Sequence, residues 1–155
     1  MLAAHDVKRP QQRRVPRACA LDLGGARVGV AISDELGLYA HPRGVLAAKP
    51  RRALIESIVA LTRDEGLTHV VCGLPLDMKG GEGDAAGKAR DLAQEIADAT
   101  GLSVELWDER LTTVEARRNL ATSEVHGAKA KARIDEASAV TILQAWLDQA
   151  DRRAR

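Results

Sequence analysis

The sequence predicts an α/β fold in which one mixed β-sheet has helices on its faces. Short apolar runs alternate along the chain with segments in which apolar residues recur at helical spacing. The first two runs are joined by a short glycine turn, which is typical of a hairpin. A hairpin followed by alternating strands and helices produces both antiparallel and parallel neighbours. A length of 155 residues and a hydrophobic fraction of 45% suit a single domain with a sizeable core.

The first half of the chain predicts three strands and one helix. The turn Gly24-Gly25-Ala26 separates the two strands of the hairpin, and a third strand follows. These strands are expected at residues 18–23, 27–33 and 43–47. Between Pro50, which suits the first turn of a helix, and Gly66, apolar residues recur at helical spacing.

The second half predicts two further strands and three helices. A β-branched run and a second apolar run indicate buried strands, and Gly101 ends the helix between them. The expected strands are 68–73 and 103–107, and the expected helices are 84–100, 112–121 and 134–148.

The composition argues against several kinds of site. Cys19 and Cys72 fall in predicted core strands and form neither a disulfide framework nor a zinc spacing, which suits a reduced cytosol. The four histidines show no ligand spacing, and the scarcity of aromatic residues argues against a base-stacking platform. No apolar run approaches membrane-spanning length, and the basic N-terminus lacks an export segment. We therefore expect a cytoplasmic protein without membrane contact.

Basic residues gather at both ends of the chain. Residues 1–17 hold five Lys or Arg against one Asp, and residues 150–155 hold three Arg against one Asp. Because the whole chain has a net charge of +1, the segment between them has a net charge of −5. We expect a flexible tail at 1–17, one domain at 18–149 and a second tail at 150–155. The tails are either solvated termini or attach the protein to a polyanion.

Three carboxylates are expected at the ends of elements. Asp22 ends the first strand and interrupts an apolar pattern, which is costly unless its charge is compensated. Glu109 directly follows the last strand, and Asp135 is expected in the first turn of the last helix. The three converge if the first and last strands lie side by side. A hard divalent cation would then relieve the repulsion between them.

Each carboxylate also has a structural interpretation. Arg27 could pair with Asp22, and Asp135 could cap the last helix. Glu109 could form a surface ion pair with Arg110 or Arg117. The small residues that share a face with Asp22 could leave room for a metal and a phosphate, or they could let a helix pack closely.

Two loops carry basic residues that could contact phosphates. The glycine-rich loop 73–83 contains Lys79 and could offer backbone amides, although it lacks the established phosphate-binding glycine spacings. Loop 123–133 contains Lys129, Lys131 and Arg133 just before Asp135. The alternative is that this second loop is mobile and solvated.

Four segments of the sequence resemble the YqgF family, described as Holliday junction resolvase-like and as a pre-16S rRNA nuclease. They are residues 22–34, residues 71–76, residues 108–113, and Asp135 with residues 139–144. The four segments stand in the same order and with compatible spacing, and the resemblance extends from about residue 18 to 148. The chain departs from the family pattern at Glu136-Ala137-Ser138, and it has three matching acids where related resolvases have four.

The resemblance implies a ribonuclease H-like fold with a central five-stranded mixed sheet flanked by helices. It also implies metal-dependent hydrolysis of phosphodiester bonds, with Asp22, Glu109 and Asp135 as the catalytic acids and as ligands of Mg²⁺ or Mn²⁺. The expected substrate is the precursor of 16S rRNA in ribosomal particles. The expected oligomeric state is a monomer or a homodimer. Lys79, Arg110, Lys129, Lys131 and Arg133 are expected to contact the nucleic acid.

Three alternative functions fit parts of the same pattern. The first is a resolvase of four-way DNA junctions that uses the same acids. Resolving a symmetric junction requires two active sites that face each other. The second is a fragment of an actin-like ATPase, for which the chain is short. The third is a binding module for ribosomes or nucleic acids without catalysis.

Overall fold

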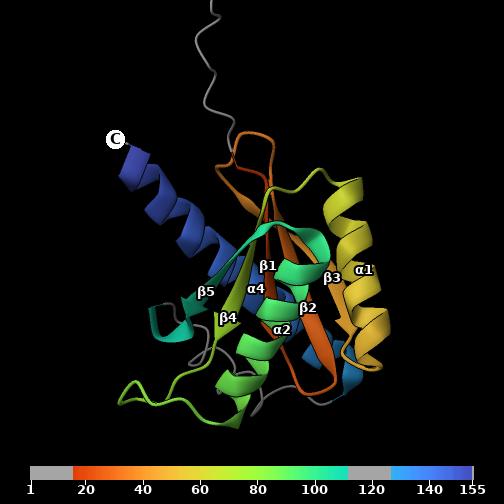
Figure 1. Ribbon diagram of the computed structural model, residues 1–155. Helices are drawn as coiled ribbons and strands as arrows, with labels where there is room; N and C mark the ends of the chain where they lie inside the picture. The colour runs from red at the N-terminus through yellow and green to blue at the C-terminus, as the bar shows by residue number, and fades with distance from the viewer. Residues whose placement is uncertain (1–15, 112–126, 155) are drawn as a thin grey trace, which may run out of the picture.

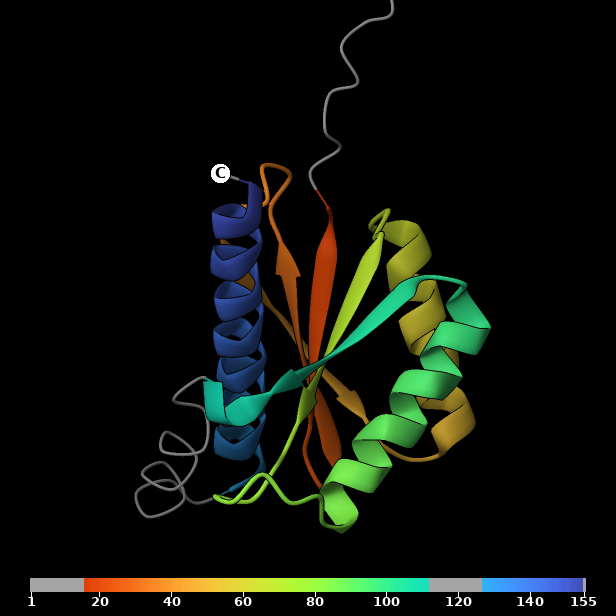
Figure 2. The ribbon, with the colours of Figure 1, turned by 60° about the vertical axis from the view of Figure 1, so that its left-hand side comes forward.

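The computed structural model describes residues 16–111 and 127–154, and it shows a five-stranded sheet between two helical layers (Figure 1). Helices α1 (Arg51–Asp64) and α2 (Asp84–Thr100) cover one face, and α4 (Ala128–Ala154) lies along the other (Figure 2). The predicted helix at 112–121 lies outside the described residues. The predicted α/β architecture is confirmed.

The sheet contains both strand directions, as the sequence predicts. Its strands are β1 (Ala18–Leu23), β2 (Arg27–Ser33), β3 (Ala40–Ala47), β4 (His69–Leu74) and β5 (Ser103–Asp108). Their order across the sheet is β3-β2-β1-β4-β5. β2 is antiparallel to both β1 and β3, whereas β1, β4 and β5 run parallel to one another. The C-terminal ends of β1, β4 and β5 therefore lie at the same edge of the domain.

Two elements are longer than predicted, because contacts and helix propensity extend them beyond their apolar patterns. β3 begins at Ala40, whose N–H donates to Oε1 of Gln144 on α4 at 2.9 Å. α4 begins at Ala128 rather than at residue 134, in a run of Ala, Lys and Arg that favours a helix without an apolar stripe. It also continues through Ala154, so the segment expected as a C-terminal tail is helical to that residue.

The core has one layer on each face of the sheet. The layer beneath α1 and α2 is built from branched aliphatic side chains together with Cys19 and Cys72, which are free thiols. Burial raises the pKa of the Cys72 thiol to about 12, so it stays protonated at neutral pH. The layer beneath α4 uses Ala18, Ala20 and Ala31 of the sheet. The small-residue face therefore serves close packing of a helix.

None of the helices in the described part of the chain combines the length and hydropathy required to cross a bilayer.

Truncation of a core side chain beneath α4 should lower the stability of the domain. Leu143 is fully buried between α4 and the sheet. We expect Leu143→Ala to reduce the free energy of unfolding by about 2–5 kcal/mol, since it removes buried methyl groups and leaves a cavity. Chemical denaturation monitored by circular dichroism measures the loss. The matched control is Leu36→Ala, because Leu36 is 69% exposed and its truncation should change the free energy by less than about 0.5 kcal/mol.

Candidate active site

Asp22 is a fully buried carboxylate near the C-terminal end of β1, 0% exposed. Its cross-strand partner on β2 is Gly29. By strand alternation it shares the α4-facing side of β1 with Ala18 and Ala20. The predicted position of Asp22 within an apolar strand is therefore correct, and the side chain lies between sheet and helix.

Glu109 approaches Asp22 by a route that the sequence did not predict. The first and last strands are not adjacent, because β4 lies between β1 and β5. Glu109 begins the short 3₁₀ helix η1 (Glu109–Leu111) after β5. Its Oε1 atom lies only 2.6 Å from the place that a Cβ atom on Gly73 of β4 would occupy. The absence of a side chain at Gly73 therefore lets the Glu109 carboxylate lie across β4.

Gly73 also lies level with Asp22. The parallel register of β1 and β4 pairs Leu21 with Cys72, so the next residue of each strand is Asp22 and Gly73. Glu109 is 6% exposed, so its carboxylate does not lie on the surface as that interpretation assumed. Of its two suggested partners, Arg110 pairs with Asp108, and Arg117 lies outside the described residues.

Asp135 lies inside α4 and not in its first turn. Because the helix begins at Ala128, the expected position is wrong, and so is the interpretation of Asp135 as a helix cap. A Cβ atom on Gly29 would lie 2.0 Å from the carbonyl oxygen of Asp135, so the helix backbone rests directly on β2. A Cβ atom on Gly24 would lie 2.9 Å from Asp135 Oδ2. The two glycines thus provide the space for Asp135.

The three acids gather around the C-terminal end of β1. On one side, Asp22 is paired with Gly29, against which the backbone of Asp135 packs. On the other side, Asp22 is level with Gly73, against which the Glu109 carboxylate lies. Carboxylate oxygens are the donors that Mg²⁺ and Mn²⁺ take in proteins, so the residue types fit such an ion. As the side chains stand, no group of three or more His, Cys, Asp or Glu within the described ranges is arranged to hold a metal ion.

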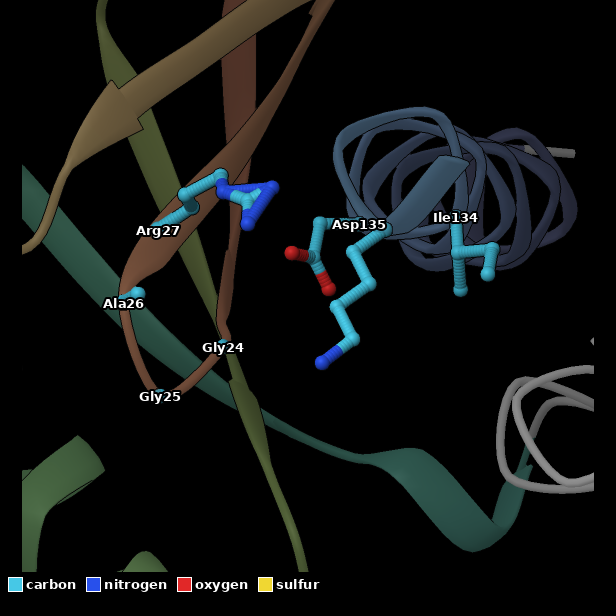
Figure 3. Close-up of a pocket in the computed structure, with 7 residues that line it drawn as sticks. Gly24, Gly25, Ala26, Arg27, Ile134 and Asp135 are labelled. Carbon is cyan, nitrogen blue, oxygen red and sulfur yellow. The ribbon is translucent and has the colours of Figure 1, made fainter. Parts of the chain in front are cut away.

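A pocket of about 280 Å³ opens beside Asp135 (Figure 3). It is lined by the β1–β2 turn and by α4, through Gly24, Gly25, Ala26, Arg27, Lys131, Ile134 and Asp135. The guanidinium group of Arg27 and the carboxylate of Asp135 point toward one another in this pocket. The sequence had suggested Arg27 only as a partner of Asp22. Its place facing α4 could not be predicted without the position of that helix.

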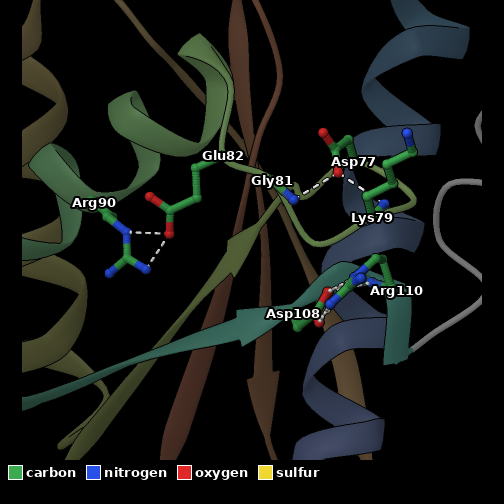
Figure 4. Close-up of polar contacts among 7 residues, drawn as sticks. All are labelled: Asp77, Lys79, Gly81, Glu82, Arg90, Asp108 and Arg110. Carbon is green, nitrogen blue, oxygen red and sulfur yellow. Dashed lines mark hydrogen bonds and ion pairs between the residues drawn. The ribbon is translucent and has the colours of Figure 1, made fainter.

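The loop between β4 and α2 is a tight turn organised by Asp77 (Figure 4). Oδ1 of Asp77 accepts hydrogen bonds from the backbone N–H groups of Lys79 at 2.9 Å and Gly81 at 2.6 Å. The N–H of Gly80 donates to the carbonyl oxygen of Asp77 at 3.0 Å. These three amides are already used within the turn, so they are not the ones that could bind a phosphate. The exposed Lys79 side chain is what the turn offers to a ligand.

Arg110 is held against this turn by a second carboxylate. Its Nη2 atom lies 2.7 Å from Asp108 Oδ2, and its Nε donates to both carboxylate oxygens at 3.1 Å (Figure 4). The hydrogen bonds from Arg110 lower the pKa of Asp108, so this carboxylate stays ionised. A Cβ atom on Gly80 would lie 3.4 Å from Arg110 Nη1, which places the guanidinium group beside the turn.

The other predicted basic residues lie on the first turns of α4. Lys129, Lys131 and Arg133 are exposed there, and Lys131 lines the pocket beside Asp135. The loop predicted at 123–133 is therefore helical from residue 128 onward, and residues 123–126 lie outside the described part of the chain.

Comparison with known families gives a match over most of the chain. The sequence signature of the RuvX family, also called YqgF and described as Holliday junction resolvase, matches residues 16–149. A protein of Myxococcus xanthus named "Putative pre-16S rRNA nuclease" is 42% identical over 132 residues, which cover 85% of this chain and 87% of the relative. A protein of the same name from Pelotomaculum thermopropionicum is 43% identical over 140 residues, which cover 90% of this chain and 91% of the relative.

Solved structures show the same fold at low sequence identity. The structure described as Thermus thermophilus RuvC in complex with a Holliday junction substrate has a TM-score of 0.56 and 12% identity, over 88% of this chain and 96% of RuvC. A further Thermus thermophilus RuvC structure has a TM-score of 0.52. These similarities confirm the ribonuclease H-like fold.

A methyl group at Gly29 should destabilise the contact between β2 and the α4 backbone at Asp135. The added Cβ in Gly29→Ala would lie 2.0 Å from the Asp135 carbonyl oxygen, so α4 must move away from the sheet. We expect a loss of about 1–3 kcal/mol in the free energy of unfolding, measured by chemical denaturation. Gly25→Ala is the matched control, because no atom lies within 4 Å of its added Cβ. Equal stability of the two variants would contradict the close approach of helix and sheet.

Proposed function

The chain belongs to the RuvX family, and on this premise we propose that it is a metal-dependent nuclease that hydrolyses phosphodiester bonds in the precursor of 16S rRNA. The observation that carries the proposal is the gathering of Asp22, Glu109 and Asp135 around the end of β1. Three elements far apart in the sequence supply these acids. Gly29 and Gly73, on the two strands that flank β1, leave the space that Asp135 and Glu109 occupy.

Asp22, Glu109 and Asp135 would hold a divalent metal, Mg²⁺ or Mn²⁺. When bound, such an ion supplies a water of lowered pKa as the nucleophile and stabilises the leaving oxygen. Asp22 would anchor this ion, because it is the most buried of the three and belongs to a central strand. Glu109 and Asp135 would complete the ligand set from either side and orient the attacking water. Small adjustments of their side chains are part of this proposal, because the described side chains do not form a metal cluster as they stand.

The basic side chains around the acids would hold the substrate. Arg27 and Lys131 line the pocket beside Asp135, where their positive charge would balance the phosphate at the cleavage point. The remaining cations lie on two separate elements and would contact flanking phosphates. They are Lys79 and Arg110 near the β4–α2 turn, and Lys129 and Arg133 on α4.

An RNA substrate is favoured over DNA because the relatives at about 40% identity carry the name of a pre-16S rRNA nuclease. The Holliday junction belongs to the description of RuvC, with which this chain shares 12% identity and the fold. An rRNA precursor would place the activity in the cytoplasm, within ribosomal particles, with the protein as a monomer or homodimer. A four-way DNA junction is the alternative substrate, and a binding module without catalysis is the alternative function.

The choice of substrate predicts a specific result with purified protein. We expect cleavage of an rRNA precursor near the 5′ end of the 16S sequence in Mn²⁺ or Mg²⁺, and no symmetric cleavage of a four-way DNA junction. Product lengths on denaturing gels separate internal cleavage from trimming of an end. Cleavage of the DNA junction alone would establish the resolvase instead. Binding of the rRNA precursor without any product would establish the binding module.

Replacement of the buried carboxylate should abolish cleavage without loss of affinity for RNA. Asp22→Asn keeps the shape of the side chain but removes the negative charge that would anchor the ion. We expect kcat to fall at least about a hundredfold, which corresponds to a loss of about 3 kcal/mol of transition-state stabilisation. Cleavage assays give the rate, and circular dichroism and an RNA-binding titration verify fold and affinity. Asp91→Asn, at an exposed position of α2, is the control and should cleave normally. Undiminished cleavage by the Asp22 variant would exclude the proposed site.

A further inference from the structure

Glu136 connects α4 to the edge strand β3, one residue after Asp135. Its Oε2 atom accepts a hydrogen bond from the backbone N–H of Gly44. The pair is partly buried and joins residues that are 92 positions apart in the sequence. This contact therefore anchors the helix to the sheet at the turn that carries Asp135.

An irregularity in β3 makes this N–H available. Gly29 of β2 pairs with Val45, whereas Ala31 pairs with Pro42, so two residues of β3 lie opposite Val30 alone. The bulge formed in this way contains Gly44, whose φ of 89° is readily adopted by glycine. Bulges free a backbone group from the strand ladder, and here the freed N–H donates to the helix.

A second close contact lies at the same turn. The position of a Cβ on Gly29 is 2.0 Å from the Asp135 carbonyl oxygen and 2.8 Å from the Glu136 nitrogen. The helix backbone therefore rests on β2 while the Glu136 side chain reaches β3. Before this turn, Lys129, Lys131 and Arg133 are exposed to solvent. Asp135 thus belongs to the part of α4 where the exposed first turns give way to the turns packed on the sheet.

We propose that Glu136 is a positioning residue for Asp135. Its hydrogen bond to the β3 bulge fixes the rotation and height of one turn of α4, and thereby the place from which the Asp135 carboxylate would reach a metal ion. The consequence for the metal rests on the proposed function, whereas the positioning of the helix turn does not. Glu136 itself binds the backbone of Gly44, so it would act through its neighbour Asp135.

Two substitutions separate positioning from a general loss of stability. Glu136→Ala removes the acceptor, whereas Glu136→Gln keeps an amide oxygen that can accept the same hydrogen bond. Glu95→Ala is the matched control, because Glu95 joins α2 to α1 through Arg51 at 3.0 Å, on the opposite face of the sheet. All variants are studied as the full chain, well below their unfolding temperatures.

The first measurement is amide hydrogen exchange, which needs neither metal nor substrate. In Glu136→Ala we expect exchange to become at least about tenfold faster at Gly44 and across residues 134–138. Glu136→Gln should restore the slow exchange, and Glu95→Ala should leave both segments unchanged. Unchanged exchange across 134–138 in Glu136→Ala would overturn the proposal, whatever the protein does to RNA.

The second measurement is the affinity for Mn²⁺, followed by electron paramagnetic resonance of the free ion. We expect Glu136→Ala to weaken Mn²⁺ binding by about tenfold, with kcat at a fixed Mn²⁺ concentration reduced and KM for RNA unchanged. If Glu136→Ala binds Mn²⁺ with wild-type affinity, the hydrogen bond to Gly44 holds the helix without positioning Asp135 for a metal ion. That result would overturn the proposal. Absence of Mn²⁺ binding in the wild-type protein would contradict the proposed function, and the exchange measurement would still decide the positioning.

Discussion

The structure depends on the close approach of the α4 backbone to β2. At Gly29 the helix carbonyl of Asp135 occupies the space where any other residue would place its side chain. On the same face of β1 and β2, the residues Ala18, Ala20 and Ala31 are also small, which suits a helix that lies close to these strands. Aliphatic packing then proceeds along α4 through Ile142 and Leu143. A helix at this distance can place the Asp135 carboxylate close to the C-terminal end of β1.

That arrangement concentrates negative charge where solvation is poor. Asp22 is fully buried and Glu109 nearly so, and burying such groups opposes folding unless cations or hydrogen bonds compensate. Arg27 and Lys131 bring positive charge to the neighbouring pocket. A protein that needed only a stable core would place aliphatic side chains at these positions. An ion bound in the proposed site would compensate the charge of these carboxylates.

Much of the fold could be predicted because hydrophobic periodicity reports local structure. The hairpin around Gly24-Gly25-Ala26 and the helix ending at Gly101 were predicted from such patterns and are confirmed. The strand order could not be predicted, because it depends on long-range pairing that periodicity does not encode. The place of Gly73 between Asp22 and Glu109 was missed for this reason. Asp135 was misplaced because Ala128 and the residues after it form helix by propensity, without an apolar stripe.

Glu109 follows a strand at the edge of the sheet, whereas Asp22 belongs to the strand at its centre. β5 pairs with β4 on one side only among the described strands, and its residues are mostly less buried than those of β1. Edge elements open locally at lower free energy than the core to which they are attached. A brief detachment of β5 would therefore separate one carboxylate from the other two while the rest of the domain stays folded. The position of Glu109 is consequently less durable than the fold that supports it.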